Sequence, residues 1–533
     1  MDETRVDLVV VGGEICSKFS CTSLANMMDD SLGGPTGMLT ALLAKRLGVS
    51  VLVLGRPIPD AKPQPLQLGR ADALNARSQQ YLEIVGILDD LISQGLKCNT
   101  SSTFTNGGFA SRQSHWWTGL QHVLHKNFLM IGQPVVEQLL AAELKESLLY
   151  NERVESIRET ECGVEVATIS QRIVHGTYCI ASDGARSMVR QALRIPFTGT
   201  KPEMLWAVLD TFIDSDFPRC PEIITFELDG ESRVAWIPRE RGLARFYILL
   251  DGEVTEEKSK ASIKRHLAPY RVDFTKTEWF STFEVKERIA ETFISQNGNG
   301  RIILAGDAAH CHAVNGGQGL NTGLSDAFSL GWRMAYILKY SDKLAPGAAN
   351  RILQSYDAER RKVAENVIRV AARLVRDIKY EATQYVGNVE KNANYITGMG
   401  IAYHDLGSPA VRESEVGIWK AGRACPDILL TTPGASESRY LYSIVTYGKY
   451  MVLVAGDHGG HFNTFKSLVR WLRILPKADE QNCHLNGESE LSYLAEVVKE
   501  GENYAIVVRP DMYIAYAGTA EGATEYLAEI FVS

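Results

Sequence analysis

A strand–helix–strand pattern at the N-terminus limits the folds open to this chain more than any other feature of its sequence. Residues 6–11 form a mostly apolar, β-branched run, and VSVLVL at 49–54 forms a second, as expected for buried strands. Residues 35–47 between them have helical spacing and end at Gly48, a common helix stop. Two strands joined by one helix pair in parallel, because a parallel pair needs a crossover of this kind. The pattern therefore predicts an α/β fold.

The turn between this first strand and the helix carries a divided glycine motif. In G-x-G-x-x-G the glycines let the backbone approach a pyrophosphate at a helix N-terminus, where free N–H groups favour an anion. Here 20 residues, 14–33, separate Gly12 from Gly34 and Gly37, and removing them restores the motif. A tolerated surface loop is one interpretation, because long insertions cost little closure entropy. We favour a translated intron or gene-model error, since the insertion divides a turn whose shortness is its function.

Two later strand–turn segments favour the same kind of ligand. IASDGARSMVR at 180–190 places Asp183 between a strand and a helix, although an Asp-Gly pair is also a common structural turn. LAGDAAHCHAVNGGQGLNTG at 304–323 is more specific, because Gly306-Asp307 follows a strand and a glycine-rich turn then enters a helix. Asp307 could accept hydrogen bonds from ribityl hydroxyls, and N–H groups at the helix start could stabilise a reduced flavin. Those candidate donors are Gly317, Gly319, Leu320 and Asn321.

Further along the chain, the hydrophobic pattern changes twice. Between about 195 and 300 the strands WAVLDTFID, RVAWIPRE and ARFYILL alternate, as in a mostly antiparallel sheet. A buried strand at 301–306 and helical stretches at 320–339 and 347–379 follow, and a new α/β segment begins near 416. At 533 residues the chain is long enough for two or three domains with sizeable cores.

Charge and cysteine content exclude several classes of protein. The 56 basic and 64 acidic residues give a net charge of −8, which argues against a broad nucleic-acid surface. No apolar stretch reaches membrane-spanning length, so we expect no membrane insertion. The nine cysteines are scattered and form no CxxC pair, which is typical of reduced thiols in a cytoplasmic protein.

Taken together, the motifs resemble those of the class A flavoprotein aromatic monooxygenases, of the phenol hydroxylase type with a thioredoxin-like C-terminal domain. The resemblance rests on the restored GGGPTG, GRADALNAR at 69–77, DGARS, GDAAH with GGQGLNTGLSDA, and RPDMYIAY at 509–516. It implies a Rossmann-like FAD-binding domain at 1–194 and 301–415, interleaved with a mostly antiparallel substrate-domain sheet at 195–300. Residues 416–533 would form the thioredoxin-like domain, which serves association rather than redox chemistry.

The resemblance also assigns roles to single residues. Asp72 in GRADAL matches the family's active-site acid, and PRERGLARFY at 238–247 supplies Arg239 and Tyr247. The substrate's phenolic hydroxyl would bond Tyr247, and Asp72 would assist its deprotonation. The electron-rich phenolate would then attack a flavin C4a-hydroperoxide, while Arg239 tunes the charge near the flavin. Arg77 and Gln133 match positions that hold the pyrophosphate and ribityl chain of FAD.

The implied cofactor is FAD, with NADPH or NADH as co-substrate, O2 as oxidant, a small phenolic or aromatic substrate, and a homodimer as an open possibility. Two positions depart from the family. Gly55 stands where an acidic residue usually binds the ribose, and Val314 stands where a proline often faces the flavin. Two alternatives remain: an impaired or FAD-free homologue, because the glycine motif is divided, and a flavin-dependent halogenase, although the WxWxIP signature is absent.

Overall fold

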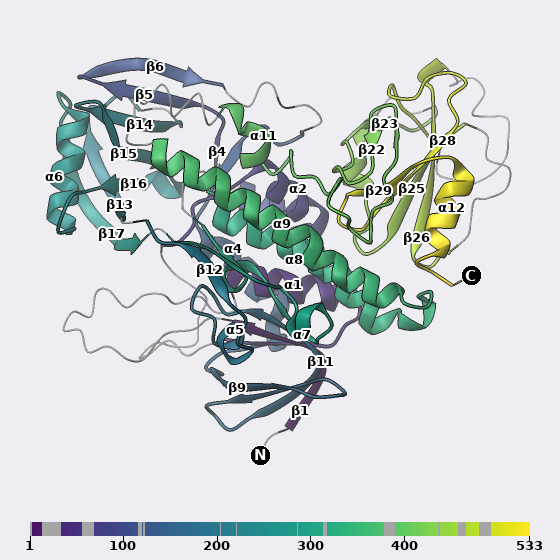
Figure 1. Ribbon diagram of the computed structural model, residues 1–533. Coiled ribbons are helices and arrows are strands. Elements are labelled where there is room, and N and C mark those ends of the chain that lie inside the picture. The colour runs from purple at the N-terminus through teal and green to yellow at the C-terminus, as the bar shows by residue number, and fades with distance from the viewer. Residues whose placement is uncertain are drawn as a thin grey trace.

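The computed structural model contains three large sheets, with long helices between them (Figure 1). The divided-loop segment 14–33 and Val314 lie outside the described residues, so both hypotheses about them stay predictions. The described residues are 3–12, 34–55, 69–115, 120, 123–202, 204–219, 221–284, 286–312, 317–377, 390–434, 437–456, 465–478 and 492–532.

The first sheet is the predicted parallel one. Its strands follow the order β8-β2-β1-β11-β10-β9. In addition, β19 pairs with the C-terminal end of β11. β1, β2, β8, β11 and β19 run parallel, whereas β10 and β9 form an antiparallel extension. The strands are β1 (Glu3–Gly12), β2 (Val51–Leu54), β8 (Leu148–Leu149), β9 (Val154–Glu159), β10 (Val164–Thr168), β11 (Ile173–Ser182) and β19 (Ile302–Leu304).

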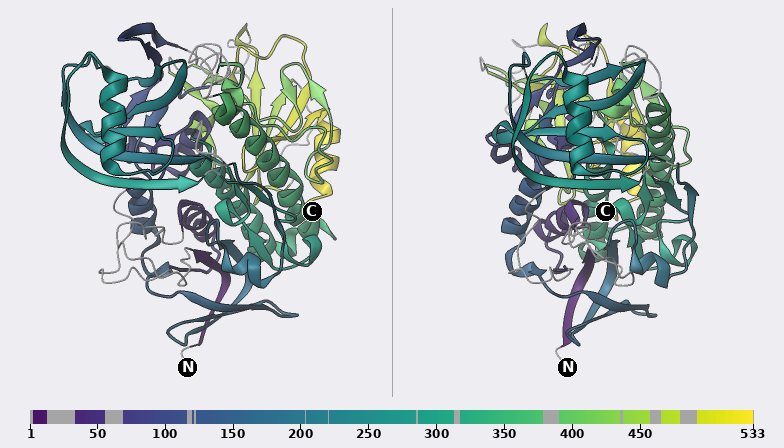
Figure 2. Two further views of the ribbon diagram at one scale, coloured as in Figure 1. Left: turned by 60° about the vertical axis from the view of Figure 1, so that its left-hand side comes forward. Right: turned by 90° about the vertical axis from the view of Figure 1, so that its left-hand side faces the viewer.

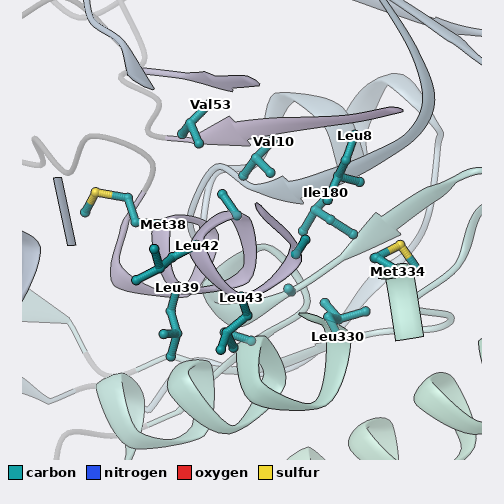
Figure 3. Packing of buried hydrophobic residues seen from close by; sticks show 14 of the residues in the cluster. Leu8, Val10, Met38, Leu39, Leu42, Leu43, Val53, Ile180, Leu330 and Met334 are labelled. Carbon is teal, nitrogen blue, oxygen red and sulfur yellow. The ribbon is translucent and has the colours of Figure 1, made fainter. Parts of the chain in front are cut away.

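Helix α1 (Gly34–Arg46) is enclosed between this sheet and α8 (Gln318–Lys339). It therefore needs no polar face, and its residues from Gly34 to Ala44 are all buried. Figure 3 shows the two contact surfaces of this core. Met38, Leu39, Leu42 and Leu43 of α1 lie between Leu8, Val10, Val53 and Ile180 of the sheet and Leu330 and Met334 of α8.

The second sheet has the order β17-β13-β16-β15-β14-β5-β6 and is antiparallel apart from the β14–β5 pair. Helix α6 (Glu256–Leu267) covers its outer face, and α9 (Ala348–Asp377) packs on the opposite side (Figures 1 and 2). Two of its strands, β5 and β6, come from the chain before residue 195. The hydrophobic pattern placed this sheet at 195–300 and did not predict that they belong to it. The strands are β5 (Ser101–Thr105), β6 (Gly108–Ser114), β13 (Leu205–Ser215), β14 (Ile223–Leu228), β15 (Glu231–Pro238), β16 (Ala244–Leu249) and β17 (Val272–Glu284).

The third sheet lies at the C-terminal end and has the order β24-β23-β27-β26-β25-β28-β29. One of its faces shares an aromatic core with α8, in which Trp332 and Tyr336 meet Tyr450 and Phe531. The thioredoxin-like assignment and the domain boundaries stay predictions. The elements are β23 (Leu429–Thr431), β24 (Ser438–Tyr440), β25 (Tyr450–Ala455), β26 (Val469–Leu475), β27 (Ser492–Leu494), β28 (Tyr504–Val508), β29 (Ile514–Gly518) and α12 (Ala520–Ala528).

The predicted α/β fold class is therefore confirmed, including a mostly antiparallel second sheet. Within the described ranges, no helix combines the length and apolarity that crossing a bilayer requires.

Candidate active site

The glycine positions predicted to hold FAD meet around the first turn of α1. Gly12 is the last residue of β1, and α1 begins at Gly34, which has a φ of +55°. A Cβ on Gly37 would lie 2.2 Å from the Ser182 Oγ of β11, so the helix packs against the strand more closely than a side chain allows. This close contact is the role that the third glycine has in a dinucleotide-binding turn.

Thr36, in the same turn of α1, contacts the second predicted segment. A Cβ on Gly306 would lie 2.9 Å from Thr36 Oγ1, and a Cβ on Gly323 of α8 would lie 2.2 Å from it. The N-terminus of α1, the Gly306-Asp307 turn and α8 therefore converge at one place. Backbone N–H groups at a helix start, surrounded by glycines, form a cradle that suits the phosphates of a dinucleotide.

Asp307 is exposed although both its neighbours in the chain are buried. Asp326 of α8 holds the ends of this turn: its Oδ2 accepts from the Gly306 N–H at 2.9 Å and lies 2.8 Å from His310 Nε2. Its Oδ1 accepts from Arg360 Nε at 2.7 Å. Burial raises the pKa of Asp326, but Arg360 and His310 outweigh burial and hold the pKa at about 2. The turn that presents Asp307 is thus fixed by a buried, ionised carboxylate.

The start of α8 is joined to the segment that carries Asp72. Asn321 Oδ1 accepts from the Asn75 N–H at 2.9 Å, and Asn321 Nδ2 donates to the Ala73 carbonyl at 3.0 Å. Gly317, with a φ of +62°, precedes α8, and Gly319 and Leu320 lie in its first turn. The structure therefore brings the start of α8 into direct contact with the segment that leads to Arg77. The side chain of Asn321 makes this contact.

Arg77 lies on α2 (Ala76–Val85) and is almost completely buried. Its Nη1 donates to the Tyr442 hydroxyl of the C-terminal region at 3.0 Å, whereas Nε and Nη2 have no hydrogen-bond partner among the described residues. A buried guanidinium with unused donors suits an anion such as a phosphate. Its predicted role is compatible with this environment and stays a prediction.

Asp183 has a different environment from the one its predicted role suggests. Its carboxylate accepts from Ser187 Oγ at 2.6 Å and from the Val189 N–H at 3.1 Å. Ser187 in turn caps α5 (Met188–Ala192) by accepting from the Arg190 N–H. Burial raises the pKa of Asp183. The structure therefore shows a helix-start contact for Asp183, and a contact with FAD stays a prediction.

Asp72 and Tyr247, predicted from distant segments, lie together. Asp72 immediately precedes β3 (Ala73–Leu74), and Tyr247 is on β16. The Tyr247 hydroxyl donates to Asp72 Oδ2 at 3.1 Å, and both side chains are largely shielded. Burial, and then the charge of Asp72, raise the pKa of Tyr247 well above its ordinary value. The tyrosine therefore keeps its proton and is placed to pass it to the carboxylate.

Arg239 and Gln133 lie beside this pair. Arg239 donates to Glu240 through Nε and Nη2 at 2.8 and 2.7 Å, and its Nη1 is 3.7 Å from Asp210. A Cβ on Gly132 would lie 2.5 Å from Arg239 Nη2, so the guanidinium packs directly on the start of α4 (Gln133–Leu144). The Gln133 N–H donates to the carbonyl of Ala71, next to Asp72.

Sequence reasoning missed Arg245 and Asp210. Arg245 is fully buried and donates to both oxygens of Asp210 at 2.6 Å, and its Nη1 lies 3.4 Å from Asp72 Oδ2. The two residues are direct partners across β13 and β16. Their signal was one charged residue within an apolar run of each strand, Asp210 in LWAVLDTFI and Arg245 in ARFYIL. Arg245 stands two positions before Tyr247 and hence on the same face.

These charges set the electrostatics of the site. Asp72, Asp210 and Glu240 supply three carboxylates against the guanidiniums of Arg239 and Arg245. Asp210 and Glu240 each have a close guanidinium partner, so Asp72 is the carboxylate in excess. Accepting one proton there would neutralise the group. The arrangement can therefore act as a proton acceptor for a hydroxyl that reaches Tyr247.

The profile of the FAD binding domain family matches residues 33–371, and the chain belongs to this family. The match begins at residue 33, the last residue of the segment that divides the glycine motif. The FAD-dependent monooxygenase ankC of Aspergillus thermomutatus is 26% identical over 93% of this chain and 96% of its own length. A phenol 2-monooxygenase of Aspergillus fumigatus, fsqG, is 27% identical over 69% of this chain and 64% of its own.

Solved structures show the same fold. A ternary complex of aklavinone-11 hydroxylase with FAD and aklavinone superposes with a TM-score of 0.74 at 20% identity, covering 99% of both chains. The flavin-dependent monooxygenase PieE, in complex with FAD and substrate, gives a TM-score of 0.72 at 17% identity, over 99% of this chain and 100% of its own. The prediction that the chain is a flavoprotein monooxygenase of the aromatic hydroxylase type, with FAD as cofactor, is confirmed at the level of the family.

Proposed function

We propose that this protein hydroxylates a phenolic ring, consuming O2 and NADPH or NADH. The observation that carries the proposal is the hydrogen bond of 3.1 Å between Tyr247 and Asp72, in a shielded site beside a buried Arg245. Relatives named for phenol and for 3-hydroxybenzoate support a phenolic substrate. A carboxylate in excess, next to a tyrosine that stays protonated, is the chemistry that activating a phenol requires.

The FAD would be held where α1, the Gly306-Asp307 turn and α8 converge. The α1 N-terminus and its glycines fit the pyrophosphate, and the exposed Asp307 fits the ribityl hydroxyls. The chemistry supplied by the bound cofactor is acceptance of a hydride and activation of O2. Every other part of the reaction falls to the protein's own side chains.

Tyr247 would bind the substrate hydroxyl and relay its proton. As the substrate gives a proton to the Tyr247 oxygen, the tyrosine's own proton moves along the existing hydrogen bond to Asp72. The resulting phenolate is more electron-rich at its ortho and para carbons. Arg245 stabilises the negative charge of Asp72 before this transfer and keeps Asp210 paired throughout.

Tyr247→Phe tests this proposal. We expect hydroxylation to fall about 100-fold or more, because general acid–base catalysis contributes at least that much, while the flavin absorbance of the purified protein stays unchanged. Product formation is measured by chromatography on a panel of small phenols, with Tyr270→Phe on the outer side of the sheet as the matched control. Turnover equal to the wild type would remove Tyr247 from the mechanism.

A further inference from the structure

The face of the second sheet that carries Tyr247 is arranged in rows, because direct partners on antiparallel strands lie side by side on the same face. Val208, Ala235 and Ser281 share the row of Tyr247, through the pairs Val208↔Tyr247, Ala235↔Tyr247 and Val208↔Ser281. These neighbours are small. On one side of this row lies the Arg245–Asp210 pair, and on the other side lies a bulky apolar row.

That bulky row contains Trp206, Leu249 and Phe283. Trp206 and Leu249 form a buried cluster with Ala371 of α9, and the ring of Tyr247 packs against this cluster. Trp206 is a diagonal neighbour of Tyr247, and such neighbours have Cα atoms roughly 7–8 Å apart. Trp206 and Tyr247 therefore lie in adjacent rows of one face and contact the same apolar cluster.

The indole nitrogen of Trp206 is a buried donor that the protein does not use. Trp206 is 3% exposed, and its Nε1 makes no hydrogen bond to any residue that the structure describes. On the same face, Arg245 and the Tyr247 hydroxyl have hydrogen-bond partners. The Nη1 of the nearby Arg239 has no hydrogen-bond partner among the described residues, but it lies 3.7 Å from the carboxylate of Asp210. An indole nitrogen can only donate, and leaving a buried donor unused is costly, so such a group calls for an acceptor.

We propose that Trp206 is a specificity-determining residue that donates its N–H to a carbonyl oxygen on a second ring of the substrate. The preferred substrate is then a fused-ring phenol: its hydroxylated ring lies over the small residues around Tyr247, and its carbonyl points to Trp206. This inference rests on the proposed function, because it takes Tyr247 as the anchor of the phenolic hydroxyl.

Two matched ligands test the inference. 6-Hydroxy-1-tetralone and 5,6,7,8-tetrahydro-2-naphthol have the same rings and hydroxyl, and only the first has a carbonyl on the second ring. Calorimetry on the FAD-loaded protein should give a dissociation constant about ten-fold lower for the ketone, the effect of one added hydrogen bond. Trp206→Phe should abolish this difference while leaving binding of the carbocycle unchanged. Electronic effects of the carbonyl on the phenol are common to both proteins and cancel in the comparison.

Trp236→Phe is the control, because Trp236 is a buried tryptophan on the opposite face of the same sheet, packed toward α6. This variant should keep the ten-fold preference. A preference that survives in Trp206→Phe, or no preference in the wild type, would overturn the inference. A second measurement needs no variant: among the eight indole N–H signals of the wild type, the ketone should shift one downfield and the carbocycle none. No ketone-specific shift also overturns it.

Product analysis on the same ligands separates this inference from the proposed function. A ketone preference that depends on Trp206, without hydroxylation of either phenol, supports the binding role and contradicts the proposed reaction. Hydroxylation of both phenols, with the same ligand preference in the wild type and in Trp206→Phe, supports the proposed reaction and contradicts the binding role of Trp206.

Discussion

Asp72 lies among buried carboxylates, and it differs from them in having no close guanidinium partner. Asp210 has Arg245 at 2.6 Å, and Glu240 has Arg239 at 2.7 Å, whereas Asp72 has a hydroxyl at 3.1 Å and a guanidinium at 3.4 Å. Ion pairs in a low-dielectric interior are expensive to disrupt, because the remaining charge is left without a partner. The two arginines therefore hold the site together, and Asp72 is the carboxylate with the most distant guanidinium partner.

Arg245→Met, alone and combined with Asp210→Leu, separates the contribution of Arg245 to stability from its contribution to hydroxylation. Alone it should lower the free energy of unfolding by about 3 kcal/mol or more, because Asp210 is left buried with only the more distant Arg239. The double variant with Asp210→Leu should recover most of this loss, measured by urea unfolding, because apolar residues of similar volume replace the pair. Hydroxylation should stay low in both variants. Full activity in a stable double variant would show that Arg245 has only a structural role.

Among the elements, the turn of residues 306–310 connects the cofactor region to the long helices. Asp326 on α8 binds both ends of the turn, and Arg360 on α9 binds Asp326. The neighbouring Glu359 belongs to a separate buried network with Arg333 and Arg509. The orientation of Asp307 thus depends on one carboxylate that lies 19 residues further along the chain.

Asp326→Asn should weaken FAD binding about ten-fold or more, measured by quenching of flavin fluorescence, because the turn loses its charged acceptor. The pKa of Asp326 is lowered from 3.8 to about 2 in the folded protein. Its contribution to stability is therefore complete above the ordinary pKa and is lost as the pH falls toward 2. Acid unfolding of the variant should be less steep across that window.

Glu359→Gln is the matched control for Asp326→Asn. It disturbs a buried carboxylate of the adjacent network, so it should lower stability without changing the affinity for FAD. Equal losses of FAD affinity in the two variants would mean that general destabilisation, and not the turn, controls binding of the cofactor.

The divided glycine motif concerns the connection between β1 and α1. β1 ends at Gly12 and α1 begins at Gly34, and the family match starts at residue 33. A chain without residues 14–33 should therefore bind FAD at least as tightly as the full chain and support phenol-dependent NADPH oxidation, because the short turn is restored. Absorbance at flavin wavelengths after purification is the measurement. A colourless, folded deletion variant would contradict the gene-model hypothesis, as would a mature transcript that encodes the segment.

On the level of the whole molecule, the C-terminal sheet is joined to the rest by a continuous interior. Arg509 donates to both oxygens of Glu359 on α9, and Arg333 of α8 lies 3.3 Å from Asp511. The thiol of Cys425, the one cysteine of this region among the described residues, has its pKa raised by burial. A buried thiol with a raised pKa is a poor nucleophile, so Cys425 is not suited to thiol exchange.

Removing residues 416–533 should therefore give an aggregated product instead of a soluble FAD-binding fragment. The truncation exposes Trp332 and Tyr336 and leaves Glu359 without Arg509. Size-exclusion chromatography of the expressed fragment is the measurement. A monomeric fragment that binds FAD would show that the C-terminal region is independent.

Local pattern was enough to predict several central elements of the fold. The strands at 6–11, 49–54 and 301–306 and the helices at 35–47, 320–339 and 347–379 correspond to β1, β2, β19, α1, α8 and α9 within a few residues. The place of β5 and β6 in the second sheet was not predictable, because β14 pairs with β5 across more than a hundred residues. Periodicity reports which face of a strand is buried, but not which strand lies beside it.

The sequence by itself determined the family and the cofactor class, because motif residues and their spacing carry that information. The joint role of Asp72 and Tyr247 was implied only by the resemblance to the family. Only the tertiary structure decided that Asp210 pairs with Arg245, that Asp183 bonds its own turn, and that Trp206 has an unused donor beside Tyr247. These facts depend on distances between strands and helices far apart in the chain. Hydrogen bonding and burial in the folded chain decide whether a polar residue has a structural partner or is left for a ligand.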